Sequence, residues 1–250
     1  MKSLAPAMLQ RIDLHCHILP GVDDGPQDLD NALGMARMAV ADGTGLLVAT
    51  PHFQPGTWDT TLDQVARAAA LFREALQRED IDLELRWAGE VRLGPEVLGR
   101  LRRRDLPCLD PDRRFLLLEF PHPEIPPGAL YQVELLRLAG YSPVIVHPER
   151  NGTIRKRPGA LRPFVELGCR FQITAGSLCG EFGSSAQAAA RALLERGWVD
   201  VIASDGHSFY RRHPVLADGL REATRLVGET AARRLVIDTP RAILEGTLPS

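Results

Sequence analysis

The stretch Ile12-Asp13-Leu14-His15-Cys16-His17 begins as a short apolar strand and ends in two histidines. Successive side chains of a strand point to opposite faces, so His15 and His17 share one face and Cys16 points the other way. Two imidazoles on one face, one residue apart, can hold a single metal ion. A half-exposed strand with two polar residues is the simpler interpretation, and this stretch alone does not decide between the two.

Short apolar runs alternate with longer helical patterns along the rest of the chain. Several runs are rich in Val, Ile and Leu with little polar alternation, which is typical of strands covered on both faces. Seven such strands, most followed by a helix, indicate parallel βαβ units in an α/β fold, either a barrel or an open doubly wound sheet. The expected strands are residues 12–15, 45–50, 83–88, 115–120, 143–146, 171–174 and 199–203. The expected helices include residues 28–41, 61–78, 95–103, 129–139, 160–167 and 186–196.

Local signals mark several helix ends. Thr61 and Gln64 have the spacing of a capping box at the start of the second expected helix. Gly140, Gly168 and Gly197 follow three other helical patterns, at positions where a left-handed residue commonly ends a helix. These signals set the expected helix boundaries.

The composition excludes several classes of protein. The 250 residues are 44% hydrophobic and 25% charged, as in an ordinary globular protein. The net charge of −2 provides no overall positive field for nucleic acid or an anionic membrane. No apolar run approaches the ~20 residues of a membrane-spanning helix, and we expect no signal peptide. The scattered cysteines are typical of free thiols in a reducing cytoplasm; they are Cys16, Cys108, Cys169 and Cys179.

Six of the seven expected strands carry His, Asp or Glu at their C-terminal ends, where α/β proteins build their active sites. Each residue alone has an ordinary explanation, but so many at one end of the fold indicate a metal site. Glu90 and Glu119 also follow directly on apolar strands, where a carboxylate needs a partner. Ligands spread around the whole ring favour a closed barrel. The predicted ligands are His15, His17, Asp24, His52, Glu90, Glu119, His147, Asp205 and His207.

The types of ligand limit the metal. Imidazoles and carboxylates without a thiolate disfavour a structural zinc site and suit Mn²⁺, Fe²⁺ or catalytic Zn²⁺. Five histidines and four carboxylates are too many for one ion and suit two or three. Three divalent ions would leave an excess charge of about +2, which suits a phosphate dianion.

The ordered ligand set resembles the PHP (polymerase and histidinol phosphatase) superfamily. The sequence is closer still to the bacterial manganese-dependent protein-tyrosine phosphatases of the CpsB/YwqE type. The similar stretches are residues 13–26, 49–53, 147–150 and 174–178. The resemblance runs from about Ile12 to the C-terminus. We therefore expect an N-terminal extension at residues 1–10 and a single PHP phosphatase domain at residues 11–250.

The resemblance implies a distorted (β/α)7 barrel that holds three divalent ions, most readily Mn²⁺, with Fe or Zn as alternatives. It assigns the first ion to His15, His17, Glu90 and Asp205. It assigns the second ion to Glu90, Glu119 and His147. It assigns the third ion to Asp24, His52 and His207, and it favours Asp24 over the adjacent Asp23, which is expected to be a loop residue.

The resemblance also implies that two arginines bind phosphate. One is Arg150, and the other follows the last histidine, where Arg212 is the prediction and Arg211 the neighbouring alternative. The planar guanidinium of arginine matches phosphate better than the point charge of lysine does. His122 and His213 stay open as candidates for a general acid.

The expected reaction is metal-assisted hydrolysis of phosphotyrosine, with a metal-bound hydroxide as nucleophile. The resemblance implies a cytoplasmic enzyme whose substrate is the tail of a bacterial tyrosine kinase in capsule or exopolysaccharide regulation. A histidinol-phosphate or other small phosphomonoester phosphatase is the alternative. The net charge disfavours a nuclease, and the complete ligand set disfavours a module that only binds a partner.

Cys108 and Arg114 have the Cys-x5-Arg spacing of cysteine-dependent tyrosine phosphatases. The intervening loop has no glycine, and Pro111 removes a backbone N–H donor. Asp110 and Asp112 would repel a phosphate and raise the pKa of the thiol. We therefore interpret this spacing as a coincidence.

Overall fold

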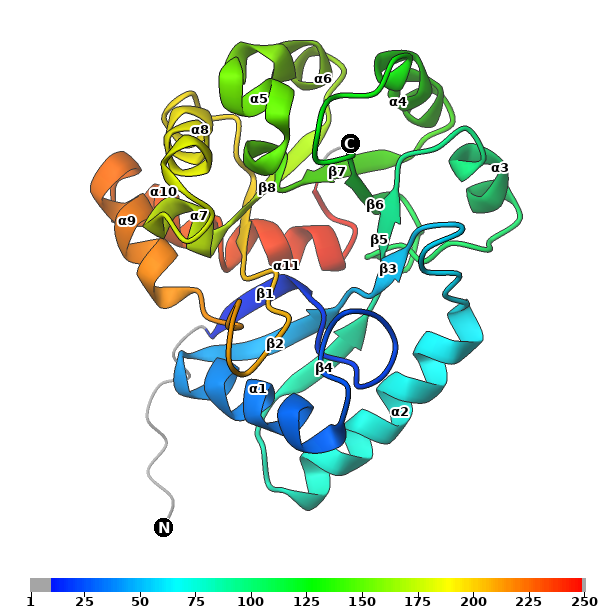
Figure 1. Ribbon diagram of the computed structural model, residues 1–250, viewed down its shortest axis with the longest axis vertical. Helices are drawn as coiled ribbons and strands as arrows, with labels where there is room; N and C mark the ends of the chain where they lie inside the picture. The colour runs from blue at the N-terminus through cyan, green and yellow to red at the C-terminus, as the bar shows by residue number, and fades with distance from the viewer. Residues whose placement is uncertain (1–9, 249–250) are drawn as a thin grey trace.

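Two parallel sheets form the wall of a barrel in this computed structural model, which describes residues 10–248. One sheet has the order β1-β2-β4 and the other the order β3-β5-β6-β7-β8-β9. The helices surround the strands on the outside (Figure 1). The strands are β1 (Arg11–Cys16), β2 (Thr44–Ala49), β3 (His52–Phe53), β4 (Glu84–Trp87), β5 (Glu90–Arg92), β6 (Phe115–Glu119), β7 (Ser142–Val146), β8 (Arg170–Thr174) and β9 (Val201–Ala203).

Two pairs of these strands are halves of longer ones. β2 leads into β3 through Thr50 and Pro51, and β4 leads into β5 through two residues. The backbone ladder continues across this gap, because the N–H of Ala88 donates to Ala49 O and the N–H of Glu90 donates to Pro51 O. Within residues 10–248 the nine strands therefore make seven continuous parallel strands of the barrel, as the sequence predicts. These seven are called the barrel strands below.

The ring closes between β1 and β9 at the carboxyl ends of the strands. The N–H of His17 donates to Gly206 O, and the N–H of Asp205 donates to His15 O, each at 2.8 Å. These two bonds stand in place of a regular hydrogen-bond ladder, so β1 and β9 are joined only near their carboxyl ends. The fold is thus a distorted (β/α)7 barrel, as expected, and its closing seam holds three of the predicted ligands.

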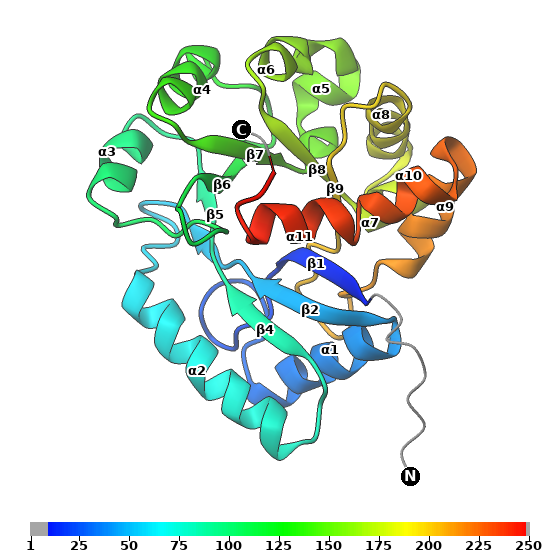
Figure 2. The same cartoon turned by 180° about the vertical axis from the view of Figure 1, so that it is seen from behind.

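The opposite end of the same seam is filled by a segment near the C-terminus. Ile12 donates its N–H to Val236 O at 2.8 Å, and Ile202 donates its N–H to Leu235 O at 3.0 Å. Helix α11 (Asp238–Leu244) follows directly and lies across the ring of strands (Figure 2). The barrel therefore has a closed floor and an open mouth.

The barrel interior is apolar on the floor side. The side chains there form one buried cluster made of Ile12, Leu14, Leu46, Val48, Ala88, Leu109, Phe115, Leu117, Val144, Val146, Val201, Ala203, Ile243 and Leu244. The last two belong to α11, so the helix completes this core. A second, larger cluster lies between the strands and the outer helices.

Most expected helices occur with small changes at their ends. They are α1 (Leu29–Ala41), α2 (Leu62–Arg78), α3 (Val97–Arg102), α4 (Ala129–Leu138), α6 (Arg162–Glu166) and α8 (Ser184–Glu195), with two 3-10 turns, η1 (Pro148–Arg150) and η2 (Pro158–Leu161). The N–H of Gln64 bonds to Thr61 Oγ1 as the capping box predicts. Gly140, Gly168 and Gly197 have φ of 87°, 75° and 67°, so all three end their helices as expected.

Four further helices lie outside the expected set: α5 (Gly152–Lys156), α7 (Ala175–Cys179), α9 (Ala217–Val227) and α10 (Glu229–Arg234). Helix α11 is also unexpected. Of the described residues, no helix combines the length and the apolar composition needed to cross a membrane. The expected N-terminal extension lies, except for Gln10, outside the described residues.

The floor of the barrel gives a test of stability. Leu244 is 3% exposed and Leu138 is 79% exposed. Leu244→Ala should lower the free energy of unfolding by about 2–4 kcal/mol because it opens a cavity in the inner core. Leu138→Ala, the same change on the surface, should alter it by less than about 0.5 kcal/mol. Urea unfolding at equilibrium measures both, and equal midpoints would show that α11 does not complete the core.

Candidate metal centre

All nine predicted ligands lie together at the mouth of the barrel. They come from the C-terminal ends of six barrel strands and from the loop after β1. Their nitrogen and oxygen atoms form four overlapping groups, and within each group one atom per residue lies within 4.8 Å of the others. These groups are His17, Asp24, His52 and His207; His15, His17 and Asp205; His15, Glu90 and His147; and His52, Glu90 and Glu119.

Four buried side chains form the deepest part of the centre. His15 Nε2 and His17 Nε2 are 3.2 Å apart. Glu90 Oε2 lies 3.7 Å and 3.4 Å from these two nitrogens, and Asp205 Oδ1 lies 3.5 Å and 3.6 Å from them. Ligands about 2.1 Å from a tetrahedral ion lie about 3.4 Å from one another. Each carboxylate oxygen therefore has the spacing of a ligand that shares an ion with the two histidines. Glu90 and Asp205 fall in different groups, so the assignment of all four residues to one ion stays a prediction.

Glu90 lies in the middle of the centre. Its Oε1 is 2.7 Å from His147 Nε2, and its Oε2 is 2.8 Å from His52 Nδ1. With the contacts to His15 and His17, this one carboxylate reaches four histidines. The geometry fits a bridging carboxylate, the role that the resemblance implies.

The outer part of the centre lies nearer to solvent. Asp24 Oδ1 is 3.4 Å from His52 Nε2 and 3.4 Å from His207 Nε2, and its side chain is 47% exposed. This trio is the one predicted for the third ion. Glu119 groups with His52 and Glu90, whereas His147 groups with His15 and Glu90. The trio predicted for the second ion therefore does not form one group, and its assignment stays a prediction.

Several buried atoms of the centre lack a well-aligned hydrogen bond among the described residues. Glu90 Oε2 and His52 Nδ1 lie 2.8 Å apart, and Glu119 Oε2 lies 3.0 Å from Arg92 Nη2, so these atoms have ion-pair contacts alone. Asp205 Oδ1 is at least 3.5 Å from the nearest histidine nitrogens. A buried polar atom without a hydrogen bond costs about 1–3 kcal/mol, and more when it is charged. Coordination to a divalent ion would satisfy such atoms. The donor set therefore fits divalent metal ions.

Burial and close contact shift the proton affinities unevenly. Burial opposes protonation of His17 and His52, but Asp23 raises the pKa of His17 to about 9 and Glu90 raises that of His52 to about 11. Burial and then the Glu90 charge raise the pKa of Glu119 to about 8. Burial and then Arg150 lower the pKa of His147 to about 3. Metal binding would displace protons from those ligands whose pKa is raised.

Two side chains outside the predicted set hold the histidine rings. Asp23 Oδ2 lies 2.6 Å from His17 Nδ1, and Gln172 Oε1 lies 2.9 Å from His15 Nδ1. A proton on each Nδ1 leaves the Nε2 lone pair free to face the centre. Both residues therefore position predicted ligands.

Asp23 is not the plain loop residue that the sequence predicts. It is 4% exposed, and its carboxylate also accepts the backbone N–H groups of His52 and Gly25, each at 3.0 Å. The loop reaches this position only because residue 25 is glycine, since a Cβ there would lie 2.2 Å from His17 O. One carboxylate thus connects the loop to two ligand segments.

Asp13 fixes the closing seam below the centre. Its carboxylate accepts the N–H of Ser204 at 3.0 Å, the hydroxyl of Ser204 at 2.5 Å and the N–H of His15 at 3.3 Å. Burial raises the pKa of Asp13 to about 6, although these bonds oppose the shift. The residue therefore ties β1 to the end of β9.

The predicted arginines meet on one carboxylate oxygen. Asp205 Oδ2 lies 2.6 Å from Arg150 Nη1 and 2.7 Å from Arg212 Nη2. Burial opposes ionisation of Asp205, but the two guanidiniums hold its pKa well below the usual range. The Phe182 ring faces both, with its centroid 4.8 Å from Arg150 Cζ and 5.8 Å from Arg212 Cζ. Arg212, and not Arg211, therefore contacts the centre.

The two open candidates for a general acid differ in position. His122 Nδ1 is 3.5 Å from Glu119 Oε1, and its ring lies 5.6 Å from that of His147. His213 is exposed and is absent from all four ligand groups found among the described residues. His122 is thus the candidate at the site.

Cys108 lies outside the centre. Burial raises the pKa of its thiol to about 11, with Asp110 acting in the same direction and Arg113 opposing it. Arg114 contacts Asp110 and Asp112 at 3.8 Å and 3.9 Å. A thiol with so high a pKa is a poor nucleophile at neutral pH. These contacts agree with a coincidental Cys-x5-Arg spacing.

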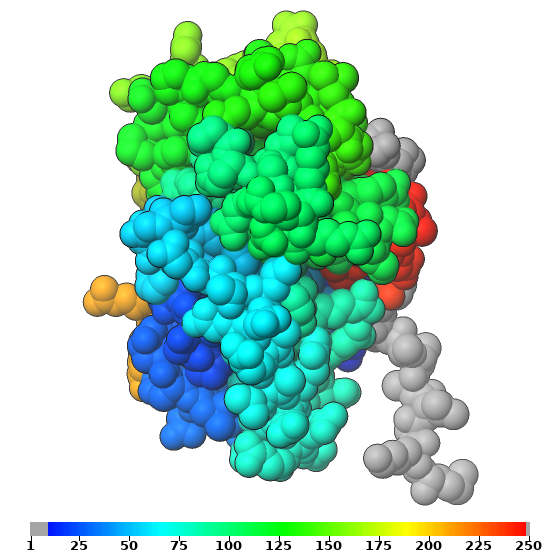
Figure 3. Space-filling model, turned by 90° about the vertical axis from the view of Figure 1, so that its right-hand side faces the viewer, coloured from blue at the N-terminus to red at the C-terminus, as the bar shows by residue number. Residues whose placement is uncertain are grey.

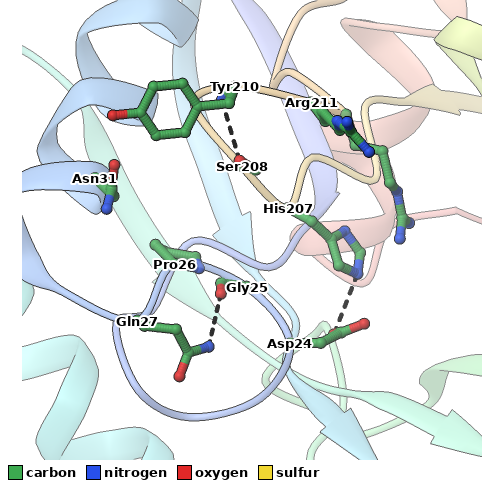
Figure 4. Close-up of a pocket in the computed structure, with 10 residues that line it drawn as sticks. Asp24, Gly25, Pro26, Gln27, Asn31, His207, Ser208, Tyr210 and Arg211 are labelled. Atoms are coloured by element: carbon green, nitrogen blue, oxygen red, sulfur yellow. Dashed lines mark hydrogen bonds and ion pairs between the residues drawn. The ribbon is translucent and has the colours of Figure 1, made fainter.

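Two cavities open beside the centre and share Arg212. The Tyr210 cavity, of about 360 Å³, has Asp24, His207 and Tyr210 on its walls (Figure 4). The Phe182 cavity, of about 250 Å³, has His122, Arg150, Arg155 and Phe182 on its walls. Either cavity places a bound group next to the ligand cluster.

A histidine and carboxylate cluster at the mouth of a parallel barrel, with two arginines beside it, defines a metal-dependent hydrolase of the barrel type. Residues 11–245 match the family model described as "Capsular polysaccharide synthesis, CpsB/CapC". The chain belongs to this family, as the sequence resemblance predicts.

Curated relatives cover most of the chain. Tyrosine-protein phosphatase YwqE of Bacillus subtilis is 41% identical over 202 residues, which are 81% of this chain and 79% of YwqE. Tyrosine-protein phosphatase CpsB of Streptococcus pneumoniae is 28% identical over 242 residues, which are 93% of this chain and 98% of CpsB.

Solved structures share the fold. A crystal structure from work on YwqE of Bacillus subtilis and CpsB of Streptococcus pneumoniae, described as metal-dependent tyrosine phosphatases, matches with a TM-score of 0.90 and 36% identity over 95% of both chains. The phosphotriesterase homology protein of Escherichia coli matches with a TM-score of 0.59 and 11% identity over 95% of this chain and 99% of that one. The second likeness shows the barrel fold alone.

The contact between Asp23 and His17 gives a test that does not depend on catalysis. Asp23→Asn should weaken Mn²⁺ binding by about 10- to 100-fold, because the neutral amide no longer fixes and polarises the ring. Isothermal titration with Mn²⁺ measures the affinity. Asp28→Asn is the control, since Asp28 is exposed and caps α1 through Asn31. Equal affinities in the two variants would remove Asp23 from the metal site.

Proposed function

We propose that this chain is a metal-dependent protein-tyrosine phosphatase whose centre holds three divalent ions, most readily Mn²⁺. One observation carries the proposal: a nine-residue histidine and carboxylate cluster shares Asp205 with two arginines at the mouth of the barrel. The curated relatives named tyrosine-protein phosphatases support the same reaction. When bound, the ions would supply an activated water and positive charge for hydrolysis of a phosphomonoester.

Arg150 and Arg212 are the proposed phosphate-binding residues. Arg150 is 9% exposed, so its guanidinium is held in place before substrate arrives. Both side chains reach the same oxygen of Asp205, which leaves their other N–H groups available for phosphate oxygens. Bidentate guanidinium–phosphate bonds are both strong and directional. The pair would orient the phosphate and offset its charge.

The Phe182 cavity supports an aromatic leaving group. Its volume of about 250 Å³ accommodates a phenyl ring, and the ring of Phe182 forms one wall beside the two arginines. Offset or edge-to-face contact between two aromatic rings adds about 0.5–1.5 kcal/mol. The phenolate of tyrosine is also a better leaving group than an aliphatic alkoxide, because the pKa of the phenol is about 10. These features favour phosphotyrosine over histidinol phosphate.

The wider role is also a proposal. The family description names capsular polysaccharide synthesis, which supports a phosphorylated tail of a bacterial tyrosine kinase as substrate. The four cysteines are free thiols, which supports a reducing compartment, the cytoplasm. The proposed domain remains residues 11–250, with residues 1–10 as an extension.

Removal of divalent ions should abolish the activity. Protein treated with a chelator and then desalted should hydrolyse a phosphotyrosine peptide at less than about 1% of the initial rate, because no activated water remains. Added Mn²⁺ should restore the rate, and Fe²⁺ or Zn²⁺ should restore less. Histidinol phosphate, assayed in parallel, should be the poorer substrate. Full turnover by metal-free protein, or a preference for histidinol phosphate, would contradict the proposal.

Arg150→Lys should lower kcat/KM for the phosphotyrosine peptide by about 10- to 100-fold, because lysine keeps the charge and loses the bidentate geometry. Metal content, measured by elemental analysis, should stay at the wild-type value. Arg162→Lys is the control, since this arginine is 72% exposed and pairs with Glu166. Unchanged kinetics in Arg150→Lys would leave Arg150 without a role in phosphate binding.

A further inference from the structure

The wall of the Tyr210 cavity is built from Asn31 on α1 and from two loops that meet beside the metal centre. One is the loop after β1, which contributes Asp24 and Gln27, and the other is the segment after β9, which contributes His207, Tyr210 and Arg211 (Figure 4). The cavity adjoins the outer ligands, whereas the Phe182 cavity adjoins Arg150. A peptide whose phosphotyrosine occupies the Phe182 cavity therefore has a second hollow next to the reacting group.

Most polar groups of the Tyr210 cavity already have partners. Gln27 donates to Asp23 O and Gly25 O, and Asn31 donates to Asp28. The one acidic residue of the lining, Asp24, faces His52 and His207.

Arg211 is the exception. It is exposed, and no ion pair or hydrogen bond involves its guanidinium within the described part of the chain. Its neighbour Arg212 is bound to Asp205, so Arg212 faces the metal centre and Arg211 lines the cavity. The unsatisfied charge in this cavity is therefore positive.

The segment that carries Arg211 is anchored before any substrate binds. Phe209 packs on α1, where a Cβ at Gly34 would lie 2.9 Å from its ring. Tyr210 is 74% exposed, and its ring meets that of Phe209 edge-on at 5.4 Å. An orange segment, which the colour bar places after β9, stands out from the surface in Figure 3. An anchored segment with an exposed aromatic ring loses little entropy when a peptide binds.

The lining of the two cavities is positive although the whole chain is not. The net charge of the chain is −2, whereas the two linings together carry four arginines, Arg150, Arg155, Arg211 and Arg212, against one carboxylate, that of Asp24. A local field of one sign raises the concentration and the association rate of a ligand of opposite charge. The partner that fits this surface is an acidic peptide.

We propose that the Tyr210 cavity is a specificity subsite that binds an acidic side chain flanking the phosphotyrosine of the substrate, with Arg211 as its ionic partner. This inference rests on the proposed phosphatase function. It names the class of substrate, peptides with Asp or Glu next to the phosphotyrosine. Arg211 is a specificity residue and not a phosphate-binding residue.

The test compares three phosphotyrosine peptides whose flanking residues are Glu, Gln or Lys, assayed with the Mn²⁺-loaded protein. The wild type should prefer the Glu peptide. Arg211→Ala should lower kcat/KM for the Glu peptide by about three- to fivefold, the effect of one partly exposed ion pair, and should change the Gln peptide by less than about twofold. Arg211→Glu should reverse the order and favour the Lys peptide. High salt should reduce the preference of the wild type.

Arg233→Ala is the control, because this exposed arginine lies on α10, which leads to the floor of the barrel. It removes the same charge and should keep the wild-type preference. An unchanged preference in Arg211→Ala and Arg211→Glu, with normal hydrolysis of p-nitrophenyl phosphate, would overturn the subsite and leave the phosphatase function standing. A wild-type protein that hydrolyses neither the peptides nor p-nitrophenyl phosphate would overturn both.

Discussion

In a closed barrel, every second side chain of a strand points into the interior. This alternation determines where the apolar core and the charged metal centre lie. Leu117 faces the apolar interior, and Glu119 faces the same way one step nearer the mouth. The same step leads from Ala88 to Glu90 and from Ala203 to Asp205. The apolar layer and the charged layer are therefore successive levels of one interior. Helix α11 seals the floor, so the charged groups meet solvent only at the mouth.

A charged layer above an apolar one is costly unless each group has a partner. The carboxylate of Asp23 and the amide of Gln172 bind the outer nitrogens of two histidines. Asp13 ties together the backbones on which His15 and Asp205 lie. An inward-facing atom such as Asp205 Oδ1 has no hydrogen bond within the described part of the chain. The outer atoms of the cluster thus have hydrogen-bond partners within the protein, whereas the inner atoms are placed to bind cations.

The sequence predicts the seven barrel strands and the nine clustered residues, because apolar runs and the polar residues that follow them are local signals. It does not predict the partners of those residues, since an aspartate such as Asp23 occurs equally well in an ordinary turn. A register shift in β1 between Asp13 and Cys16 brings both Leu14 and His15 to the interior, which strict alternation does not allow. The choice between Arg211 and Arg212 depends on the backbone, because Arg212 has a φ of 52°.

Asp205 has one oxygen toward the histidines and the other toward the two arginines. In the proposed site, a phosphate that drew the arginines away would leave more negative charge on this carboxylate and make it a stronger ligand for a cation. A cation on the first oxygen would weaken the contact with the arginines and free them for phosphate. Thermodynamic linkage would make these two effects equal in size. Cation and phosphate would then bind cooperatively, and one side chain would couple the two.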